Sequence, residues 1–282
     1  MKTAFIGLGN IGFPMAKNLV ESNFDCMIYD VFEQPIEALA KKGGVAASNL
    51  IEVAKFAEVI GVCVRDDNDV DGLLYGDEGL LEHCQQGSII AVHSTVTQEA
   101  MIRWAKDGEE KGIHIVDAPI TGGAQGAQDK TLCYMVGGDE SILERLKPVL
   151  ETSAKAIVHA GKIGDGIVLK LCNNLVNYAA FTAIDEATRL ASKAGLNHEL
   201  VYEVGEVNGI VTEMMKRFVT GRDGLKPACS DKDFKGIFAP FAKLAEKDLD
   251  AALACAETYN TALPTTTTVR EGIEAVFYKE HE

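Results

Sequence analysis

The chain has few basic residues for its length. Its 282 residues include 27 Lys and Arg against 42 Asp and Glu, so the formal net charge at pH 7 is −15. A surface with this charge repels nucleic acids and anionic membranes, and neither is an expected partner. Small anions are also repelled at long range, so an acidic substrate requires a local positive site.

Long apolar runs and paired metal ligands are also missing. No apolar run reaches the roughly 18 residues that suggest a membrane span, and the N-terminus has the pattern of a strand rather than a signal peptide. The seven cysteines form no CxxC pair. Their odd number and apolar surroundings indicate reduced, buried thiols and a cytoplasmic protein. The six histidines are dispersed, so we expect no metal site.

The most informative stretch is the first thirty residues. An apolar segment at 3–6 leads into a glycine loop, and a helical run at 13–22 and a second apolar segment at 26–29 follow. The loop consists of Gly7, Leu8, Gly9, Asn10, Ile11 and Gly12. Such a loop between strand and helix predicts a dinucleotide site, with the pyrophosphate at the helix N-terminus. An incidental glycine-rich turn is the alternative, and the surrounding order of strand, helix, strand and acid disfavours it.

Asp30 bears on the choice of cofactor. It lies 18 residues after Gly12, near the spacing expected for an acid that binds the adenosine ribose. A carboxylate there repels a 2′-phosphate, and no Lys or Arg occurs in Val31, Phe32 or Glu33. The sequence therefore favours NAD over NADP.

Strand and helix patterns alternate over the first half of the chain. Further strands are predicted at 45–46, 59–64, 88–92, 113–116, 133–138 and 156–159, with helices at 34–42, 97–110 and 140–150 and one opened by Ser48. This alternation is typical of a mainly parallel, doubly wound α/β sheet. Ligands bind beyond the carboxyl ends of such strands, so the clusters at 65–69, 93–95 and 117–123 are expected to converge on the glycine loop.

The pattern changes near residue 162. Helical segments are predicted at 167–194, 197–207, 210–220, 240–260 and 265–279, and strand signals largely vanish. Two domains are also the default for this length. We therefore expect a Rossmann domain at 1–162 and an all-α domain at 163–282, with the helix at 167–194 spanning both and lining the cleft between them.

Two further segments contain residues that can act on a substrate, whereas a third, around Lys247, shows no such signal by itself. Thr121, Gly122 and Gly123 form a strand-to-helix junction that can hold a carboxylate, or simply a tight turn. Lys170 and Asn174 share a helix face among apolar residues, where a lysine can serve as a proton donor and acceptor or can instead be ion-paired. Lys247 lies on a charged segment that has the pattern of a solvated helix face.

Taken together, these segments resemble the β-hydroxyacid dehydrogenase family, which includes 3-hydroxyisobutyrate dehydrogenases and tartronate semialdehyde reductases. The glycine loop continues into Pro14-Met15-Ala16, as in the N-terminal signature of that family. Residues 117–123 resemble its substrate loop, 161–174 its catalytic segment and 247–249 its late cofactor-contacting segment. The resemblance covers the whole chain in order.

The resemblance implies a role for each of these residues. Lys170 would be the general acid/base, and Thr121, Gly122 and Gly123, with Asn174, would bind the substrate carboxylate. Thr95 and Lys247 would approach the nicotinamide, and Val64 and Arg65 would lie along the dinucleotide. The family usually has Ser at Thr121 and Leu-Pro at Val64-Arg65, so Arg65 could face a phosphate instead. His93-Ser94-Thr95 also departs from the usual Asp-Cys-Ser-Thr ending.

We therefore predict an NAD-dependent oxidoreductase that transfers a hydride between nicotinamide and a small β-hydroxy acid or its semialdehyde. The resemblance and the helical second domain also suggest a homodimer or homotetramer. The alternatives are an imine reductase of the same fold, which the presence of Lys170 disfavours, and a non-catalytic dinucleotide-binding protein.

Overall fold

A computed structural model describes residues 1–280 of the chain. The chain divides into two compact units, Met1–Lys170 and Leu171–Glu282. The domain boundary expected at 162 stays a prediction.

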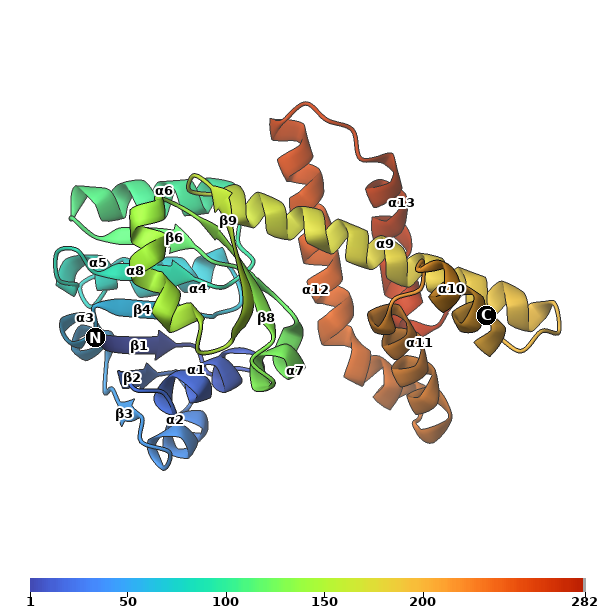
Figure 1. Cartoon of the computed structure of the whole chain (residues 1–282), viewed down its shortest axis with the longest axis horizontal. Helices are drawn as coiled ribbons and strands as arrows, with labels where there is room; N and C mark the ends of the chain where they lie inside the picture. Colours follow the sequence, from blue (N-terminus) through green and yellow to red (C-terminus); the bar gives the residue numbers. More distant parts are fainter. Residues whose placement is uncertain (281–282) are drawn as a thin grey trace. The chain divides into compact units, whose positions relative to one another are not determined.

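The first unit is built on one nine-stranded sheet (Figure 1). Its strands are β1 (Lys2–Ile6), β2 (Asp25–Tyr29), β3 (Val45–Ala46), β4 (Val59–Val62), β5 (Ile89–Val92), β6 (His114–Asp117), β7 (Ile120–Thr121), β8 (Leu132–Gly137) and β9 (Ala154–Gly161). Their order is β3-β2-β1-β4-β5-β6-β8-β7, with β9 beside β8. Every pair from β3 to β6 is parallel, whereas β8 runs antiparallel to β6 and β7. The predicted mainly parallel sheet is confirmed.

Helices connect these strands and cover both faces of the sheet. They are α1 (Gly12–Val20), α2 (Glu33–Ala40), α3 (Leu50–Phe56), α4 (Asp67–Leu74), α5 (Leu80–His83), α6 (Gln98–Glu110), α7 (Gly123–Gln128) and α8 (Glu140–Leu150). Met15 and Leu19 of α1 and Leu146 of α8 pack in one core cluster with Phe5. Ile6, whose side chain points to the opposite face, is buried too. Because both faces are covered, the central strands are continuously apolar.

Two of these helices, α4 and α5, were not predicted. Residues 65–69, which include the start of α4, were interpreted as a polar cluster, and the Asp residues there are poor helix formers. The helix nevertheless begins there, because the Asp66 side chain accepts a hydrogen bond from the Asp69 N–H at 3.1 Å and acts as the N-cap. Helix α5 has four residues, too few for a helical period to be recognised. The helix expected after Thr121 is α7, which has six residues.

The second unit contains helices and no strand among its described residues, 171–280. Helix α9 (Asp165–Lys193) begins in the first unit, and α10 (Glu199–Asn208), α11 (Glu213–Leu225), a 3₁₀ turn (Lys226–Ala228), α12 (Asp231–Thr258) and α13 (Pro264–Tyr278) follow. The prediction of an all-helical part is confirmed. Helix α12 begins nine residues earlier than predicted, because Ser230 caps it and it continues through Pro240.

One helix, α9, meets the length and composition expected of a membrane span. A single such helix is weak evidence of a membrane protein, because core helices of soluble proteins meet the same criteria.

A buried ion pair joins three helices of the second unit. Arg222 of α11 is 1% exposed, and its Nη2 lies 2.6 Å from Oδ1 of Asp185 on α9. Its Nη1 donates to the carbonyl oxygen of Val276 on α13 at 2.5 Å. The neighbouring Asp223 accepts from Arg222 Nε at 2.7 Å. The guanidinium therefore has acceptors on several sides, which is what a buried charge requires.

Replacement of Asp185 by Ala should destabilise the second unit strongly. It leaves Arg222 buried with only part of its compensating charge, at a cost of about 3 kcal/mol in the free energy of unfolding. Chemical denaturation followed by circular dichroism measures this change. Asp231, whose ion pair with Lys226 is exposed, provides the control: Asp231→Ala should have a much smaller effect. Equal destabilisation by the two variants would contradict the role assigned to Asp185.

Candidate functional site

The glycine loop joins β1 to α1 at the carboxyl edge of the sheet. Gly7 has a φ of +90°, and a Cβ on it would lie 2.2 Å from the carbonyl oxygen of Cys63. A Cβ on Gly12 would lie 1.9 Å from the carbonyl oxygen of Gly7. A side chain at either position would push the loop away from the end of β4 or push α1 away from the loop. The two glycines therefore set the shape of the loop.

The backbone between these glycines is open. A Cβ on Gly9 would meet no atom within 4 Å, and Gly9 and Asn10 are exposed. Among the residues that the structure describes, no side chain caps the N-terminus of α1. The Phe13 N–H donates to the Gly9 carbonyl oxygen at 2.9 Å and Pro14 has no N–H, so what the uncapped end offers a ligand is mainly the positive end of the helix dipole and the loop backbone before it. This arrangement fits the pyrophosphate of a dinucleotide.

Asp30 follows β2 and is tied to the glycine loop. Its Oδ2 accepts a hydrogen bond from the Leu8 N–H at 2.5 Å, and its Oδ1 accepts one from the Phe32 N–H at 2.9 Å. Each carboxylate oxygen has another lone pair, so Asp30 can still accept hydrogen bonds from ribose hydroxyls. Val31 and Phe32 are 81% and 70% exposed, so they do not cover this carboxylate as core residues would.

The ends of β4 and β5 are joined through Ser94. Its hydroxyl accepts a hydrogen bond from the Val64 N–H and donates one to the Val64 carbonyl oxygen, both at 2.8 Å. Arg65 is exposed and donates from Nε and Nη2 to Asp69, at 2.8 and 2.7 Å. Thr95, next to Ser94, is half-buried. The sequence prediction included Thr95 and omitted Ser94, although the two adjacent hydroxyls after a strand were visible in the sequence.

His93 points into the core rather than toward the ligand edge. Its ring stacks on Phe5, with centroids 5.8 Å apart, and meets the edge of Tyr134 at 5.5 Å. Nδ1 lies 2.9 Å from the carbonyl oxygen of Ala118 and must donate to it, because a carbonyl can only accept. Burial lowers the pKa of His93 to about 4, and the hydrogen bond to Ala118 opposes this shift only in part. His93 is therefore a neutral core residue at pH 7.

The glycine pair after Thr121 forms the start of α7. Thr121 ends β7, where it pairs with Cys133 of β8. Gly122 and Gly123 have φ values of +123° and +64°, which other residues rarely adopt. A Cβ on Gly123 would meet no atom within 4 Å, and no described side chain caps α7. The loop therefore has uncapped N–H groups beside open space.

Helices α1 and α7 are joined by a buried hydrogen bond. The Asn18 side chain of α1 is 4% exposed, and its Nδ2 donates to the carbonyl oxygen of Ala127 on α7 at 2.7 Å. Because α1 begins at the glycine loop and α7 begins after Thr121, this bond ties together the two helices that follow these loops. The first unit thus brings together the predicted cofactor loop and the predicted substrate loop.

Asp117 connects the end of β6 to the start of α9. Its fully buried carboxylate accepts hydrogen bonds from the N–H groups of Gly164 and Ile167, each at 2.9 Å. Burial raises the pKa of this carboxyl, and the backbone hydrogen bonds partly offset the shift. Lys170 lies in the second turn of α9 and is half-buried. Asp117 was expected with the cluster at 117–123 on the ligand edge, but its carboxylate instead binds the start of α9, 47 residues away in the chain, which leaves no local signal.

In the second unit, Asp248 holds Asn174. Asn174 Nδ2 donates to Asp248 Oδ2 at 2.7 Å, and the Tyr178 hydroxyl donates to the same oxygen at 3.2 Å. The Lys247 Nζ lies 3.9 Å from Asp248 Oδ1, and its side chain is 37% exposed. The predicted residues Asn174 and Lys247 are thus linked through one buried carboxylate.

The predicted residues of the first unit therefore lie along one edge of the sheet. The parallel pairing of β1, β4, β5 and β6 puts their carboxyl ends together. The exceptions are His93 and Asp117, whose side chains are buried. Within residues 1–280, no group of three His, Cys, Asp or Glu side chains could hold a metal ion.

Two families match consecutive parts of the chain. The family described as the NAD binding domain of 6-phosphogluconate dehydrogenase matches residues 2–161. The family described as NAD-binding of NADP-dependent 3-hydroxyisobutyrate dehydrogenase matches residues 164–281. Both descriptions indicate a nicotinamide cofactor, and they name NAD and NADP in turn.

Characterised relatives span nearly the whole chain. A 2-(hydroxymethyl)glutarate dehydrogenase of Eubacterium barkeri is 34% identical over 94% of this chain and 86% of its own length. A 2-hydroxy-3-oxopropionate reductase of Escherichia coli is 32% identical over 96% of this chain and 89% of its own. The solved structure of a Mycobacterium tuberculosis 3-hydroxyisobutyrate dehydrogenase with L-serine has a TM-score of 0.84 at 26% identity, covering 100% of this chain and 99% of that one.

Imine reductases share only the fold. One from a Pseudomonas species has a TM-score of 0.65 at 17% identity, over 99% of each chain.

The buried position of His93 predicts a loss of stability in acid. The pKa of His93 is about 4 in the folded chain against 6.5 ordinarily. As pH falls from 6.5 to 4, the unfolded chain therefore takes up a proton that the folded chain does not, and about 3 kcal/mol of stability is lost. Replacement of His93 by Gln, which does not titrate, should remove this part of the pH dependence in denaturation at pH 7 and pH 4.5. His114, which is exposed, serves as the control, and a matching change in His114→Gln would refute the assignment.

Proposed function

The chain belongs to the β-hydroxyacid dehydrogenase family, and we propose that Lys170 carries the proton transfer of a hydride exchange between NAD and a small β-hydroxy acid or its semialdehyde. The bound nicotinamide supplies the hydride acceptor or donor. In oxidation, the carbinol carbon loses a hydride and the hydroxyl proton passes to the Lys170 amine. Reduction reverses both transfers.

The position of Lys170 in the second turn of α9 is the observation that carries this proposal. Asp117 fixes the first turn of α9 to the end of β6 through two N–H groups. The backbone that carries Lys170 is therefore anchored to the end of β6, at the edge of the sheet that also bears the glycine loop. A general acid/base requires such a fixed position before its pKa matters.

The substrate carboxylate is assigned to Thr121, Gly122 and Gly123, together with Asn174. Uncapped N–H groups at the start of α7 favour an anion. Asn174 shares a helix face with Lys170, and its amide group is oriented by Asp248. These local groups supply the attraction for an acid that the overall negative charge of the chain does not. Holding the carboxylate also orients the hydroxyl toward Lys170.

The remaining predicted residues are assigned to the dinucleotide. Gly7, Leu8, Gly9, Asn10, Ile11 and Gly12 hold the pyrophosphate, with Val64 and Arg65 alongside and Thr95 and Lys247 near the nicotinamide. Asp30 binds the ribose and selects NAD, because a 2′-phosphate would meet its carboxylate charge. Residues 1–162 form the NAD-binding domain and 163–282 the substrate domain.

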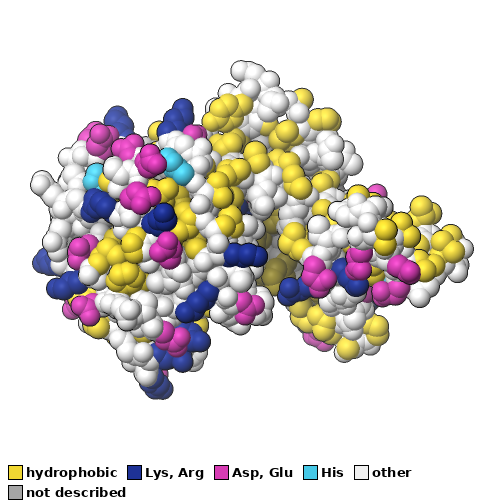
Figure 2. All heavy atoms as spheres, viewed as in Figure 1, with side chains coloured by type: hydrophobic (Ala, Val, Ile, Leu, Met, Phe, Trp, Pro, Cys, Tyr) yellow, Lys and Arg dark blue, Asp and Glu magenta, His cyan; other side chains and the backbone are white. Residues whose placement is uncertain are grey.

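The second unit also provides the surface for a homodimer or homotetramer. It exposes large apolar side chains on α9, on α10 and just after α10, where Leu190 is 71%, Val204 64%, Val207 87% and Ile210 69% exposed. Figure 2 shows hydrophobic side chains gathered on the surface of this unit. Association would remove them from water. The protein is proposed to act in the cytoplasm.

The two alternative functions are less well supported. Imine reductases are distant neighbours that share only the fold, whereas hydroxyacid dehydrogenases are related along the whole chain. A non-catalytic dinucleotide-binding protein has no need of Lys170 anchored at the strand ends.

Replacement of Lys170 by Ala should lower kcat by about 10²- to 10⁴-fold, the usual contribution of a general acid/base. NADH binding, measured by titration of its fluorescence, should remain. Substrates for the assay are C3 to C5 hydroxy acids and semialdehydes, with cyclic imines included for comparison. Lys193, exposed at the other end of α9, is the control, and Lys193→Ala should retain activity. Full activity of Lys170→Ala would exclude the assignment.

Replacement of Asp30 by Ala should shift the cofactor preference toward NADP. Loss of the ribose contacts should raise KM for NAD, and loss of the negative charge should let the 2′-phosphate bind. The ratio of kcat/KM with NADP to that with NAD is expected to rise roughly tenfold or more. Asp25, exposed at the start of β2, is the matched control. A wild-type preference for NADPH would overturn the role given to Asp30.

A further inference from the structure

We propose that Ser94 and Asp67 are positioning residues, which hold the Val64–Arg65 segment in place to receive the dinucleotide. The proposal rests on the cofactor site proposed above and adds two residues to it. Neither residue needs to touch the cofactor, because each acts on the backbone that does.

Ser94 fixes Val64 from both sides of its backbone. Its hydroxyl accepts from the Val64 N–H and donates to the Val64 carbonyl oxygen, both at 2.8 Å. Ser94 is 4% exposed, so water competes little for these bonds. A β-ladder hydrogen bond from the His93 N–H to the Val62 carbonyl oxygen, at 2.8 Å, ends just before this point. The hydroxyl thus continues the pairing of β4 and β5 beyond the last ladder bond.

The segment that Ser94 holds lies against the glycine loop. The Cys63 N–H donates to the Ile6 carbonyl oxygen at 2.9 Å, and Val64 Cγ1 lies 3.1 Å from the position of a Cβ on Gly7. A shift of Val64 would therefore also disturb the turn at Gly7. Since this turn presents the backbone to the pyrophosphate, the position of Val64 matters for cofactor affinity.

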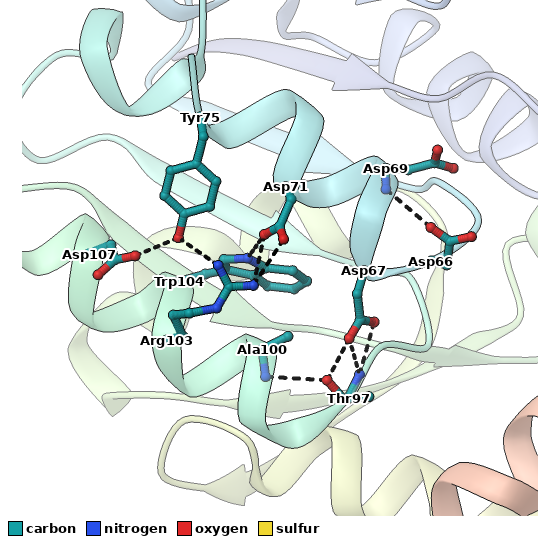
Figure 3. A network of polar contacts seen from close by, with 10 residues as sticks. All are labelled: Asp66, Asp67, Asp69, Asp71, Tyr75, Thr97, Ala100, Arg103, Trp104 and Asp107. Atoms are coloured by element: carbon teal, nitrogen blue, oxygen red, sulfur yellow. Dashed lines mark hydrogen bonds and ion pairs between the residues drawn. The ribbon is translucent and has the colours of Figure 1, made fainter.

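Asp67 holds the same segment from its other end. Figure 3 shows Asp67 of α4 directed at Thr97, the residue before α6. Its Oδ2 accepts from the Thr97 hydroxyl at 2.5 Å, and its Oδ1 accepts from the Thr97 N–H at 3.1 Å. The Thr97 hydroxyl in turn accepts from the Ala100 N–H at 3.3 Å and caps α6. Residues 64–67 and 94–97 are therefore tied together at both ends.

Three further hydrogen bonds join α4 and the residue after it to α6, farther from the ligand edge. Asp71, one turn after Asp67, accepts from Trp104 Nε1 at 2.5 Å and from Arg103 Nη2 at 2.9 Å. Tyr75 donates to Asp107 at 2.5 Å (Figure 3). These contacts attach α4 to α6 without reaching the loops. They contribute to stability only. A variant that removes one of them therefore shows the effect of a general loss of packing, against which a positioning effect can be judged.

The test compares NADH binding by the whole protein and by its variants, with calorimetric titration. Ser94→Ala and Asp67→Ala should each weaken NADH binding roughly tenfold, the effect of about one net hydrogen bond. KM for NAD should rise accordingly, with little change in kcat at saturating NAD. In protein without cofactor, hydrogen exchange of the Val64 amide should become faster in Ser94→Ala.

Two matched controls remove hydroxyls that lie elsewhere. Ser88 is also buried and donates to the Ala57 carbonyl oxygen at 3.4 Å, but it lies at the opposite end of β5. Tyr75 lies after the C-terminus of α4, away from residues 64–67, and donates to Asp107. Ser88→Ala and Tyr75→Phe can lower the melting temperature, and both should bind NADH as the wild type does.

The outcomes separate this proposal from the cofactor assignment. Weaker NADH binding by Ser94→Ala and Asp67→Ala, with unchanged controls, supports the positioning role. Wild-type affinity in both variants, or equal losses in the controls, overturns that role and leaves the cofactor site standing. A wild-type protein that binds neither NADH nor NADPH overturns both. If Ser94→Ala does not fold, Asp67→Ala decides between these outcomes.

Discussion

The buried carboxylate of Asp117 is the constraint that fixes the start of α9, the helix that carries Lys170, to the sheet. It ends a central strand and accepts hydrogen bonds from Gly164 and Ile167 at the start of α9. Gly137 and Gly166 lie so close that a Cβ on either would fall within 2.8 Å of this carboxylate. Burial without such donors would be costly for a charge. The end of β6 and the start of α9, the helix that bears Lys170, are therefore held rigidly to each other.

Much of the fold was predictable because its signals are local. Apolar strands and the glycine loop occupy short, continuous stretches, and the helical second half shows a clear period. The site was predictable only in part. Asp117, Ser94 and Asp67 act on residues that lie 30 to 50 positions away in the chain, so no spacing in the sequence reveals them. Helix α4 was missed for a different reason, since its acidic residues are poor helix formers and its start depends on the N-cap that Asp66 provides.

Two departures from the family pattern have physical explanations in the structure. His93 fills an aromatic slot between Phe5 and Tyr134 and leaves Ser94 and Thr95 to the ligand edge. Arg65 is engaged by Asp69 on the following helix turn, so its charge is partly neutralised in the chain itself.

The bond between Asn18 and the carbonyl oxygen of Ala127 has a consequence for how substrate range can change. The bond couples α1, the helix after the glycine loop, to α7, the helix after Thr121, so a shift of one helix moves the other. An insertion or deletion in residues 121–131 would pull on the cofactor loop as well. New substrates are therefore more accessible to this scaffold through exchange of side chains on a fixed backbone than through changes in loop length.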